Sequence, residues 1–167
     1  MMKNLLTLIA IITILSSCSF QNSPKTIYIV RHAEKQLVDN PDPELAQVGY
    51  VRAKKLAQIL ENQDIKHVFS TDYKRTRMTV QPTADHAGLS IQSYDPEDHD
   101  ALVEQIRSLD GNILVVGHSN TVSRLANYFV GEDEKFEDLQ EIEYDFIYEV
   151  TLENNGSKVV RRKYGEY

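Results

Sequence analysis

Hydrophobic residues along the chain follow two patterns that alternate. Short apolar runs, typical of strands buried within a parallel sheet, are separated by longer segments whose apolar residues recur at helical spacing. Strands are predicted at 26–30, 66–70, 89–94 and 112–116. Helices are predicted at 46–61, from about 73 onward, at 96–109 and at 119–130. The recurring apolar residues of the first helix are Leu45, Val48, Val51, Leu56, Ile59 and Leu60.

The last part of the chain departs from this alternation. Segments 146–152 and 158–164 are both strand-like, and the residues between them include Asn155-Gly156, a dipeptide that favours a tight β-hairpin turn. Four strands that alternate with helices, followed by a hairpin, predict an α/β fold: a three-layer α/β/α sandwich with a mostly parallel central sheet. We assign residues 26–167 to this domain, which is long enough for one hydrophobic core.

Polar residues that can cap a helix mark three of the predicted helix starts. Thr71 or Asp72 is a suitable N-cap for the second helix. Asp95 is a suitable N-cap for the third helix. Ser119 or Asn120 is available as the cap of the fourth helix.

Two of the predicted strands end on residues that can carry chemistry. Arg31 and His32 directly follow the first strand, and Gly117 and His118 follow the strand at 112–116. Open α/β sheets bind ligands at the carboxyl ends of their strands, because the loops diverge there and leave a crevice. The sequence therefore places an arginine and two histidines at one edge of the sheet.

These strand ends carry motifs of a known family. The segments Val30-Arg-His-Ala-Glu34 and Val116-Gly-His-Ser-Asn120 resemble the histidine phosphatase superfamily, whose members have an Arg-His pair after the first strand and a later Gly-His. The pattern Leu45-x-x-x-Gly49 resembles the element that opens the first helix of this family, although the family's threonine is Ala46 in this chain. The resemblance covers most of the predicted domain and implies a short, single-domain, phosphoglycerate mutase-like member.

A second arginine lies at the start of the second predicted helix. Arg75 falls in the first turn, near the free amide N–H groups and the positive end of the helix dipole, where an anion binds well. Arg77 lies about 200° farther around the helix, so the two arginines cannot both face one pocket. The family pattern Ser-x-x-x-Arg-Thr, present with one extra residue from Ser70 to Thr76, selects Arg75.

The resemblance implies phosphoryl transfer by these residues. His32 is the implied nucleophile, because a neutral imidazole can attack phosphorus and later leave it. Arg31, Arg75 and His118 are the implied phosphate-binding residues, since no metal or cofactor is implied and protein cations must stabilise the phosphoryl oxygens. The predicted function is a metal-independent phosphatase that hydrolyses a phosphomonoester or a phosphoramidate through a phosphohistidine intermediate. The alternative is a lipid-anchored protein that binds phosphate or a phosphorylated ligand without turnover.

The proton donor for the leaving group is the least constrained of these roles. Some branches of the family take it from a glutamate in the segment after the third strand, and others from an aspartate directly after the second histidine, where this chain has Ser119. Asp95 and Glu97 are the candidates, and we assign Asp95, although capping alone would explain it. Glu34 is predicted to orient the site by a hydrogen bond or to pair with Lys35.

The other histidines and acidic residues have plainer interpretations. We assign structural or surface roles to His67, His86 and His99. A zinc site built on His32 and His118 is disfavoured, because no two histidines have ligand spacing and the neighbouring arginine would repel the metal. The acidic segment 131–141 is interpreted as a solvated surface loop, since its carboxylates lack the alternate spacing of a calcium site.

The amino-terminal residues predict an export signal. Lys3 precedes an apolar stretch from Leu5 to Leu15, which is shorter than the ~20 residues of a membrane-spanning helix. The segment Leu15-Ser-Ser-Cys18 resembles the bacterial lipobox, which implies a signal peptide at 1–17, lipidation of Cys18 and a tether at 18–25. The alternatives are a buried structural cysteine or an uncleaved anchor helix. We predict an extracytoplasmic lipoprotein anchored to a membrane of the bacterial cell envelope, periplasmic if the cell has an outer membrane.

The charge of the chain excludes some partners. The chain has 25 acidic and 18 basic side chains, a formal net charge of −7, and no basic run. Such a domain is unsuited to binding nucleic acid or to electrostatic binding of anionic lipid. The predicted partners are a phosphorylated small molecule or an exposed phosphoryl group, and the membrane through the lipid on Cys18.

Overall fold

The computed structural model describes residues 24–131, 135–153 and 156–167. Its strands are β1 (Lys25–Arg31), β2 (Ile65–Ser70), β3 (Ile91–Ser93), β4 (Asn112–Gly117), β5 (Phe146–Glu153) and β6 (Gly156–Lys163). Its helices are α1 (Gln47–Leu60), α2 (Lys74–Ala87), α3 (His99–Ser108), α4 (Val122–Asn127) and a 3-10 turn, η1 (Tyr164–Glu166). The order of strands and helices along the chain is the predicted one.

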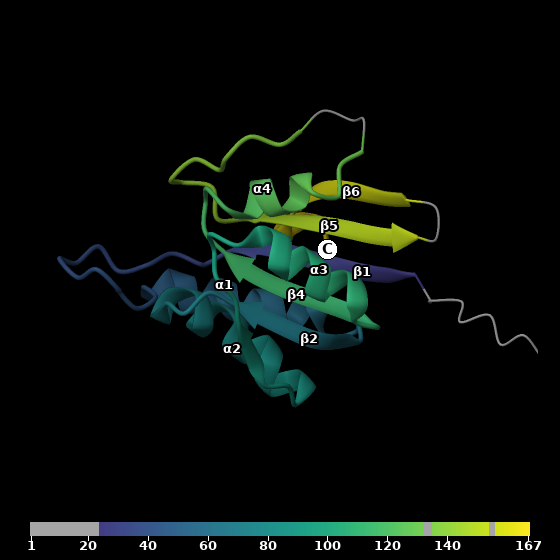
Figure 1. Ribbon diagram of the computed structural model, residues 1–167. Coiled ribbons are helices and arrows are strands. Elements are labelled where there is room, and N and C mark those ends of the chain that lie inside the picture. Colours follow the sequence, from purple (N-terminus) through teal and green to yellow (C-terminus); the bar gives the residue numbers. More distant parts are fainter. Residues whose placement is uncertain (1–23, 132–134, 154–155) are drawn as a thin grey trace, which may run out of the picture.

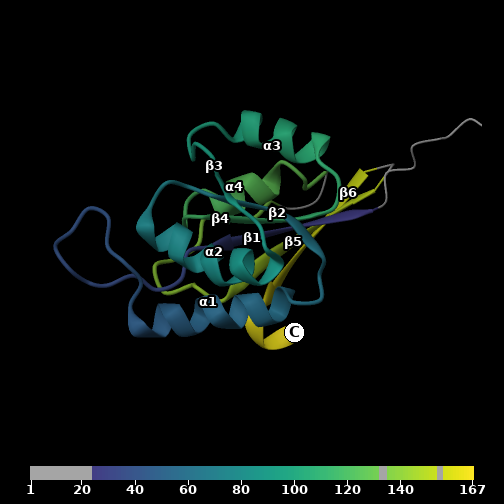
Figure 2. The ribbon, with the colours of Figure 1, turned by 90° about the horizontal axis from the view of Figure 1, so that it is seen from below.

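The strands form one six-stranded sheet in the order β3-β2-β4-β1-β5-β6 (Figure 1). β1 and β2 each pair with β4 in parallel, and β3 continues the parallel part beyond β2. β5 runs antiparallel to β1, and β6 antiparallel to β5. Helices α1 and α2 cover one face of the sheet, and α3 and α4 cover the other (Figure 2). The predicted three-layer α/β/α sandwich with a mostly parallel sheet is confirmed.

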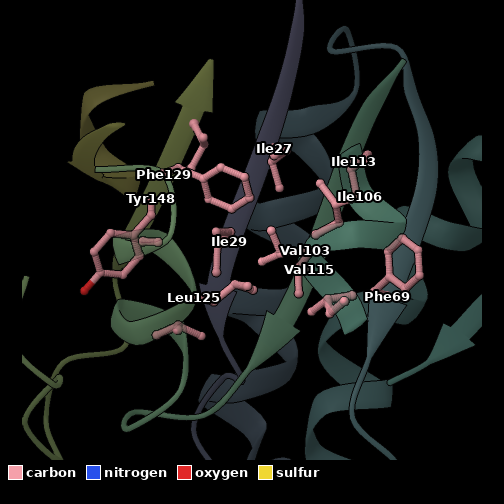
Figure 3. Close-up of a cluster of buried hydrophobic side chains, with 14 of the residues drawn as sticks. Ile27, Ile29, Phe69, Val103, Ile106, Ile113, Val115, Leu125, Phe129 and Tyr148 are labelled. Atoms are coloured by element: carbon pink, nitrogen blue, oxygen red, sulfur yellow. The ribbon is translucent and has the colours of Figure 1, made fainter. Parts of the chain in front are cut away.

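Each face of the sheet is buried by its own cluster of apolar side chains. Alternate residues of a strand point to opposite faces, so Ile27 and Ile29 of β1 pack with α3 and α4, whereas Tyr28 and Val30 pack with α1 and α2. Figure 3 shows the first cluster, in which Phe129 lies beside β1 among these side chains. Burial on both faces explains why β1 and β4 are continuous apolar runs in the sequence.

The start of α3 corrects one predicted cap. The helix begins at His99, and its N-cap is Asp98, whose side chain accepts a hydrogen bond from the amide of Ala101. Asp95 is not the cap, because its Oδ1 accepts a hydrogen bond from the amide of Glu97 at 2.9 Å and so closes a turn before the helix. A carboxylate can satisfy a nearby amide in either setting, and here the turn takes it.

The start of α2 also differs from the prediction. Its N-cap residue is Tyr73, which makes no capping hydrogen bond with its side chain. Neither of the two predicted caps serves as one: the Thr71 hydroxyl bonds to buried side chains, and the Asp72 carboxylate pairs with Arg77. Tertiary partners have replaced local capping at this helix end.

α4 and β3 are both shorter than predicted. α4 spans only Val122–Asn127, and neither Ser119 nor Asn120 caps it. The residue before the helix is Thr121, whose Oγ1 accepts a hydrogen bond from the amide of His118 at 3.0 Å. This bond fixes the turn that leaves β4. β3 has three residues where six were predicted.

Several predictions concern residues outside the described ranges. The signal peptide, Cys18 and most of the tether fall within residues 1–23, and Asn154 and Asn155 of the predicted hairpin turn also lie outside. The lipid anchor and the form of that turn stay predictions. In the part of the chain that the structure describes, no helix combines the length and the apolar character needed to cross a membrane.

One glycine allows α1 to approach the loop that follows β1. Gly49 is buried, and a Cβ at this position would collide with the carbonyl oxygen of Glu34. The same carbonyl accepts a hydrogen bond from the amide of Ala46 at 2.9 Å, which ties the residue before α1 to this loop. The close approach leaves no room for a side chain at Gly49.

We therefore expect Gly49→Ala to lower the free energy of unfolding by ~1–3 kcal/mol, the usual cost of forcing a methyl group into a packed site. The better helix propensity of alanine offsets this by at most ~1 kcal/mol. Urea denaturation measures the change. Gly165→Ala is the control, because a Cβ at Gly165 meets no atom within 4 Å. Equal stability of the two variants would contradict the close packing.

Candidate active site

The register of the sheet brings the two strand-end histidines together. β1 and β4 are parallel neighbours with Arg31 opposite Gly117, and the His32 amide continues the pairing by donating to the Gly117 carbonyl at 2.9 Å. The rings of His32 and His118 leave the same edge of the sheet, with their centroids 5.5 Å apart. Glycine is needed at 117, because a Cβ there would lie 2.7 Å from the hydroxyl of Tyr94.

His32 has the protonation state of a nucleophile. Its Nδ1 lies 2.8 Å from the carbonyl oxygen of Ala33, and because a carbonyl only accepts, Nδ1 carries the proton and Nε2 keeps a free lone pair. Burial lowers the pKa of His32 to about 3; the Ala33 bond opposes this, and the charges of Arg31, His118 and Arg75 add to it. At neutral pH the ring is uncharged.

His118 is also neutral in the free protein. Its Nδ1 lies 3.4 Å from Nη2 of Arg75, and its Nε2 lies 2.9 Å from Oγ1 of Thr71. Burial, followed by the charges of Arg75 and Arg31, lowers the pKa of His118 to about 4. The ring can therefore carry a proton on both nitrogens only after a bound anion has raised this pKa.

Arg31 is held by a segment far away in the sequence, residues 140–144. Its Nη1 donates to the carbonyls of Gln140, Glu141 and Glu143 at 2.8, 3.1 and 3.2 Å. Its Nη2 lies 3.2 Å from the Glu141 carboxylate, and its guanidinium lies over the ring of Tyr144, 4.0 Å from the centroid. Glu141, the last residue of the predicted surface loop 131–141, thus contacts Arg31, a candidate phosphate-binding residue. Its side chain is nevertheless 82% exposed.

Arg75 has a similar environment on the other side of the histidine pair. Its Nη1 lies 3.6 Å from the carboxylate of Asp42, and its guanidinium lies 4.4 Å from the ring centroid of Tyr73. The rings of Tyr73 and His118 are edge-on to each other with their centroids 5.1 Å apart. Those of Tyr144 and His32 are also edge-on, with their centroids 6.1 Å apart. Each arginine is therefore flanked by one tyrosine and one carboxylate.

Both arginines keep an unused donor. Nε of Arg31 and Nε of Arg75 are buried and have no hydrogen-bond partner in the part of the chain that the structure describes. A buried N–H without a partner costs ~1–3 kcal/mol, so such groups in a folded protein call for an explanation. Guanidinium donors of this kind beside a neutral histidine pair are suited to binding an oxyanion.

Glu34 does not pair with Lys35, which corrects one predicted alternative. Its carboxylate is bidentate with Arg52 of α1: Nε of Arg52 lies 3.0 and 2.9 Å from the two oxygens, and Nη2 lies 2.6 Å from Oε1. Burial opposes ionisation, but these bonds keep the pKa of Glu34 below its ordinary value. Arg52 belongs to α1, so the pair joins this helix to the loop that follows β1.

The predicted acid, Asp95, makes its hydrogen bond away from the two histidines. Asp95 is exposed, and its Oδ1 is used by the amide of Glu97. Arg77 has partners of its own: its Nε pairs with Asp72 at 2.8 Å, and its Nη2 donates to Ser93 at 2.7 Å. The carboxylates that do reach the arginines, Asp42 and Glu141, come from segments to which the sequence patterns gave no role in the site.

The remaining histidines have partners elsewhere. His67 bonds to the carbonyl of Asp110 at 3.1 Å, His86 lies 3.9 Å from Glu61, and His99 lies edge-on to Tyr128. Across residues 24–131, 135–153 and 156–167, no three His, Cys, Asp or Glu side chains are grouped as ligands for a metal ion.

Comparison with known sequences places this site in a family. The profile of the histidine phosphatase superfamily, branch 1, matches residues 27–97, which include the Arg31-His32 pair and Arg75. The predicted resemblance to the histidine phosphatase superfamily is confirmed over these residues. A probable phosphoglycerate mutase, GpmB, of Yersinia pestis is 34% identical over 71 residues, which are 39% of this chain and 33% of that protein. The match thus spans about a third of the length of this curated relative.

Solved structures of other proteins share the fold over most of the domain. The protein histidine phosphatase SixA, in complex with tungstate, has a TM-score of 0.67 and 19% identity, and the alignment covers 84% of this chain and 98% of that chain. A putative α-ribazole-5′-P phosphatase from Escherichia coli has a TM-score of 0.66 and 12% identity, with 83% and 96% covered. At these identities the likeness shows the histidine phosphatase fold.

Sequence patterns missed several residues that contact the candidate site residues. Thr71 was considered only as a cap, although it directly follows β2, the parallel neighbour of β4, so the argument that placed His118 applies to it as well. Tyr144 and Glu141 had no local signal, because they reach the site from more than 100 positions away in the sequence.

We expect Glu141→Gln to strengthen the binding of inorganic phosphate, because the carboxylate competes with an anion for Arg31. An exposed ion pair is worth at most ~1 kcal/mol, so the dissociation constant should fall by up to ~5-fold at low salt. Isothermal titration calorimetry measures it. Glu137→Gln, in the same acidic segment, is the control. An affinity that does not change in Glu141→Gln would show that the two anions do not compete.

The two histidines should make stability depend on pH. Their ordinary pKa is 6.5, whereas in the folded protein burial lowers it to about 3 for His32 and about 4 for His118. Between pH 6.5 and 4 the unfolded chain binds more protons, so acidification lowers the free energy of unfolding by up to ~1.4 kcal/mol per pH unit for each ring. Above pH 7 both states are neutral and the effect disappears.

His32→Gln separates this effect from the titration of carboxylates, which both proteins share. We expect the wild type to lose more stability than the variant between pH 7 and pH 5, as measured by urea denaturation at each pH. Parallel losses in the two proteins would mean that His32 is not held neutral by the fold.

Proposed function

We propose that this protein is a metal-independent phosphatase that hydrolyses a phosphomonoester or a phosphoramidate through a phosphohistidine on His32. One observation carries the proposal: a buried neutral imidazole with a free Nε2 lies within the electrostatic influence of two arginines whose Nε–H groups have no partner among the described residues. The family and the phosphatase names among the structural neighbours support phosphoryl transfer as the reaction class.

The proposed reaction has two displacements at phosphorus. In the first, Nε2 of His32 forms a bond to phosphorus while the bond to the leaving group breaks, and the leaving group takes the electron pair. In the second, a water oxygen attacks phosphorus, the P–N bond breaks, Nε2 regains its lone pair and the water proton is released. Arg31 and Arg75 would neutralise the non-bridging oxygens in both steps, the role that metal ions have in other phosphoryl-transfer enzymes.

The leaving group decides how much acid catalysis the reaction needs. An alkoxide leaving group requires a proton, and Asp95, the predicted donor, is exposed and bonded to the Glu97 amide. The nitrogen of a phosphoramidate can already be protonated when it leaves. Phosphoramidates therefore fit the site with the fewest further groups, and the neighbour SixA is described as a protein histidine phosphatase.

The rival function is phosphate binding without turnover. The same orphan donors of Arg31 and Arg75 favour it, because a tight oxyanion site needs no nucleophile. The orientation of His32, with Nδ1 tied back to Ala33 and Nε2 left free, is not required for binding alone. Turnover and its dependence on His32 therefore separate the two functions.

The test is hydrolysis of p-nitrophenyl phosphate and of phosphoramidate in excess chelator. We expect activity in the wild type, a loss of at least ~10³-fold in His32→Ala, and a loss of ~10²–10³-fold in Arg75→Ala, whose donors act on the developing charge. His86→Ala, at an exposed histidine of α2, is the matched control and should keep full activity. Rapid denaturation during turnover should trap an acid-labile phosphate on the wild type but not on His32→Ala.

The outcomes decide between the two functions. Activity that chelator abolishes, or that His32→Ala retains, would overturn the proposed route. An inactive wild type that still binds phosphate by calorimetry would favour the ligand-binding function. An inactive wild type that does not bind phosphate would refute the anion site itself.

A further inference from the structure

A chain of buried hydroxyl groups lies behind His118. Thr71 and Thr76 are both fully buried. Oγ1 of Thr71 lies 2.9 Å from Nε2 of His118 and 3.0 Å from Oγ1 of Thr76. Oγ1 of Thr76 lies 2.9 Å from the carbonyl oxygen of Thr71 and 2.8 Å from that of Tyr73. The chain runs from the imidazole to the backbone at the start of α2.

The direction of each hydrogen bond follows from the groups at the two ends of this chain. Both carbonyls can only accept, so the Thr76 hydroxyl donates to one of them and its oxygen accepts the hydroxyl proton of Thr71. The Thr71 hydroxyl has then used its one proton. Its oxygen can only accept from His118, so Nε2 of His118 carries a proton.

The other ring nitrogen gives the same result independently. Nδ1 of His118 faces Nη2 of Arg75 at 3.4 Å, and a guanidinium can only donate. A proton on Nδ1 of the neutral ring would set two donors against each other, so Nδ1 has the lone pair. If Thr71 instead donated to Nε2 of His118, the proton of the neutral ring would lie on Nδ1 and face the Arg75 donor. Thr76 would then donate to Thr71, and neither carbonyl would receive a hydrogen bond from Thr76.

We infer that Thr71 is the positioning residue of His118: its hydroxyl fixes the ring as the Nε2–H tautomer and presents Nδ1 to Arg75 and to the phosphoryl group. Thr71 accepts from Nε2–H whether the ring is neutral or protonated, so the ring keeps its place when Nδ1 takes a proton and becomes a donor. The hydroxyl chain thus confines the change of protonation to the nitrogen that faces the ligand. The kinetic consequence rests on the proposed function, but the tautomer does not.

The tautomer can be measured directly on the full-length protein purified in mild detergent. The chain has five histidines, so ¹⁵N-labelled histidine gives few signals in a long-range ¹H–¹⁵N spectrum, and His118→Gln identifies the one of interest. We expect His118 to show a protonated Nε2 and a free Nδ1 at neutral pH. A protonated Nδ1, or an average of both tautomers, would overturn the inference whether or not the protein is active.

Three threonine variants test the cause. Thr71→Val should produce a mixture of tautomers and lower kcat by ~10²-fold with little change in KM, because the catalytic ring is misplaced. Thr71→Ser keeps the hydroxyl and should restore both readouts. Thr83→Val is the matched control, since Thr83 is a buried threonine of α2 whose hydroxyl has no partner, and it should change neither readout.

The variants remain decisive if one of them fails to fold. A wild-type tautomer in folded Thr71→Val would overturn the inference. If Thr71→Val is unfolded, the wild-type and Thr71→Ser spectra decide, because both must show Nε2–H. If no protein in the series hydrolyses any substrate but the tautomers follow this pattern, the proposed function fails and the role of Thr71 stands.

Discussion

The parallel pairing of β1 with β4 is the contact on which the site depends. Arg31 lies opposite Gly117 in this pair, so the residues that follow, His32 and His118, emerge at the same level of the sheet. A slip of one residue would exchange the faces of every side chain in β1 and move Ile27 away from its core cluster. The packing on both faces therefore fixes the register, and the register fixes the separation of the two imidazoles. The geometry for chemistry is a consequence of how the core is filled.

The second constraint is that the two histidine rings stay uncharged in an environment shielded from solvent. Burial, followed by the charges of two neighbouring guanidinium groups, keeps both imidazoles neutral, which preserves the lone pair that a nucleophile needs. The arginines in turn require partners of their own. Glu141 and the carbonyls of the 140–144 segment serve Arg31, and Asp42 serves Arg75, yet each Nε–H is left over. The free site is thus balanced in charge but not saturated in hydrogen bonds, a state that a bound oxyanion completes.

The sequence patterns that predicted this fold correctly are those that depend only on the residues of one segment. Continuous apolar runs identified the central strands, and helical spacing identified α1 within one residue at each end. The buried face of α1 nevertheless uses Gly49 and Ala53, whereas Val48 and Val51 are exposed, because the close approach to the Glu34 carbonyl decides the helix orientation. Caps and ion pairs were less predictable. A carboxylate or hydroxyl near a helix start has several competing partners, and the partner that wins is set by tertiary packing.

The protonation state of the two histidine rings limits the reactions that the site could catalyse. Among the described residues, the side chains that hydrogen-bond to the rings of His32 and His118 or pack edge-on against them from outside the pair are an arginine, a threonine and two tyrosines, none of which is a carboxylic acid. Both rings are neutral before a ligand binds, so neither holds a spare proton for a leaving group at that stage. A substrate whose leaving atom brings its own proton meets this limit without any further residue. Under the proposed reaction, the described residues around the two rings would leave the attack on phosphorus unimpaired and would supply no acid for the leaving group, which is why we propose phosphoramidates ahead of simple alkyl esters.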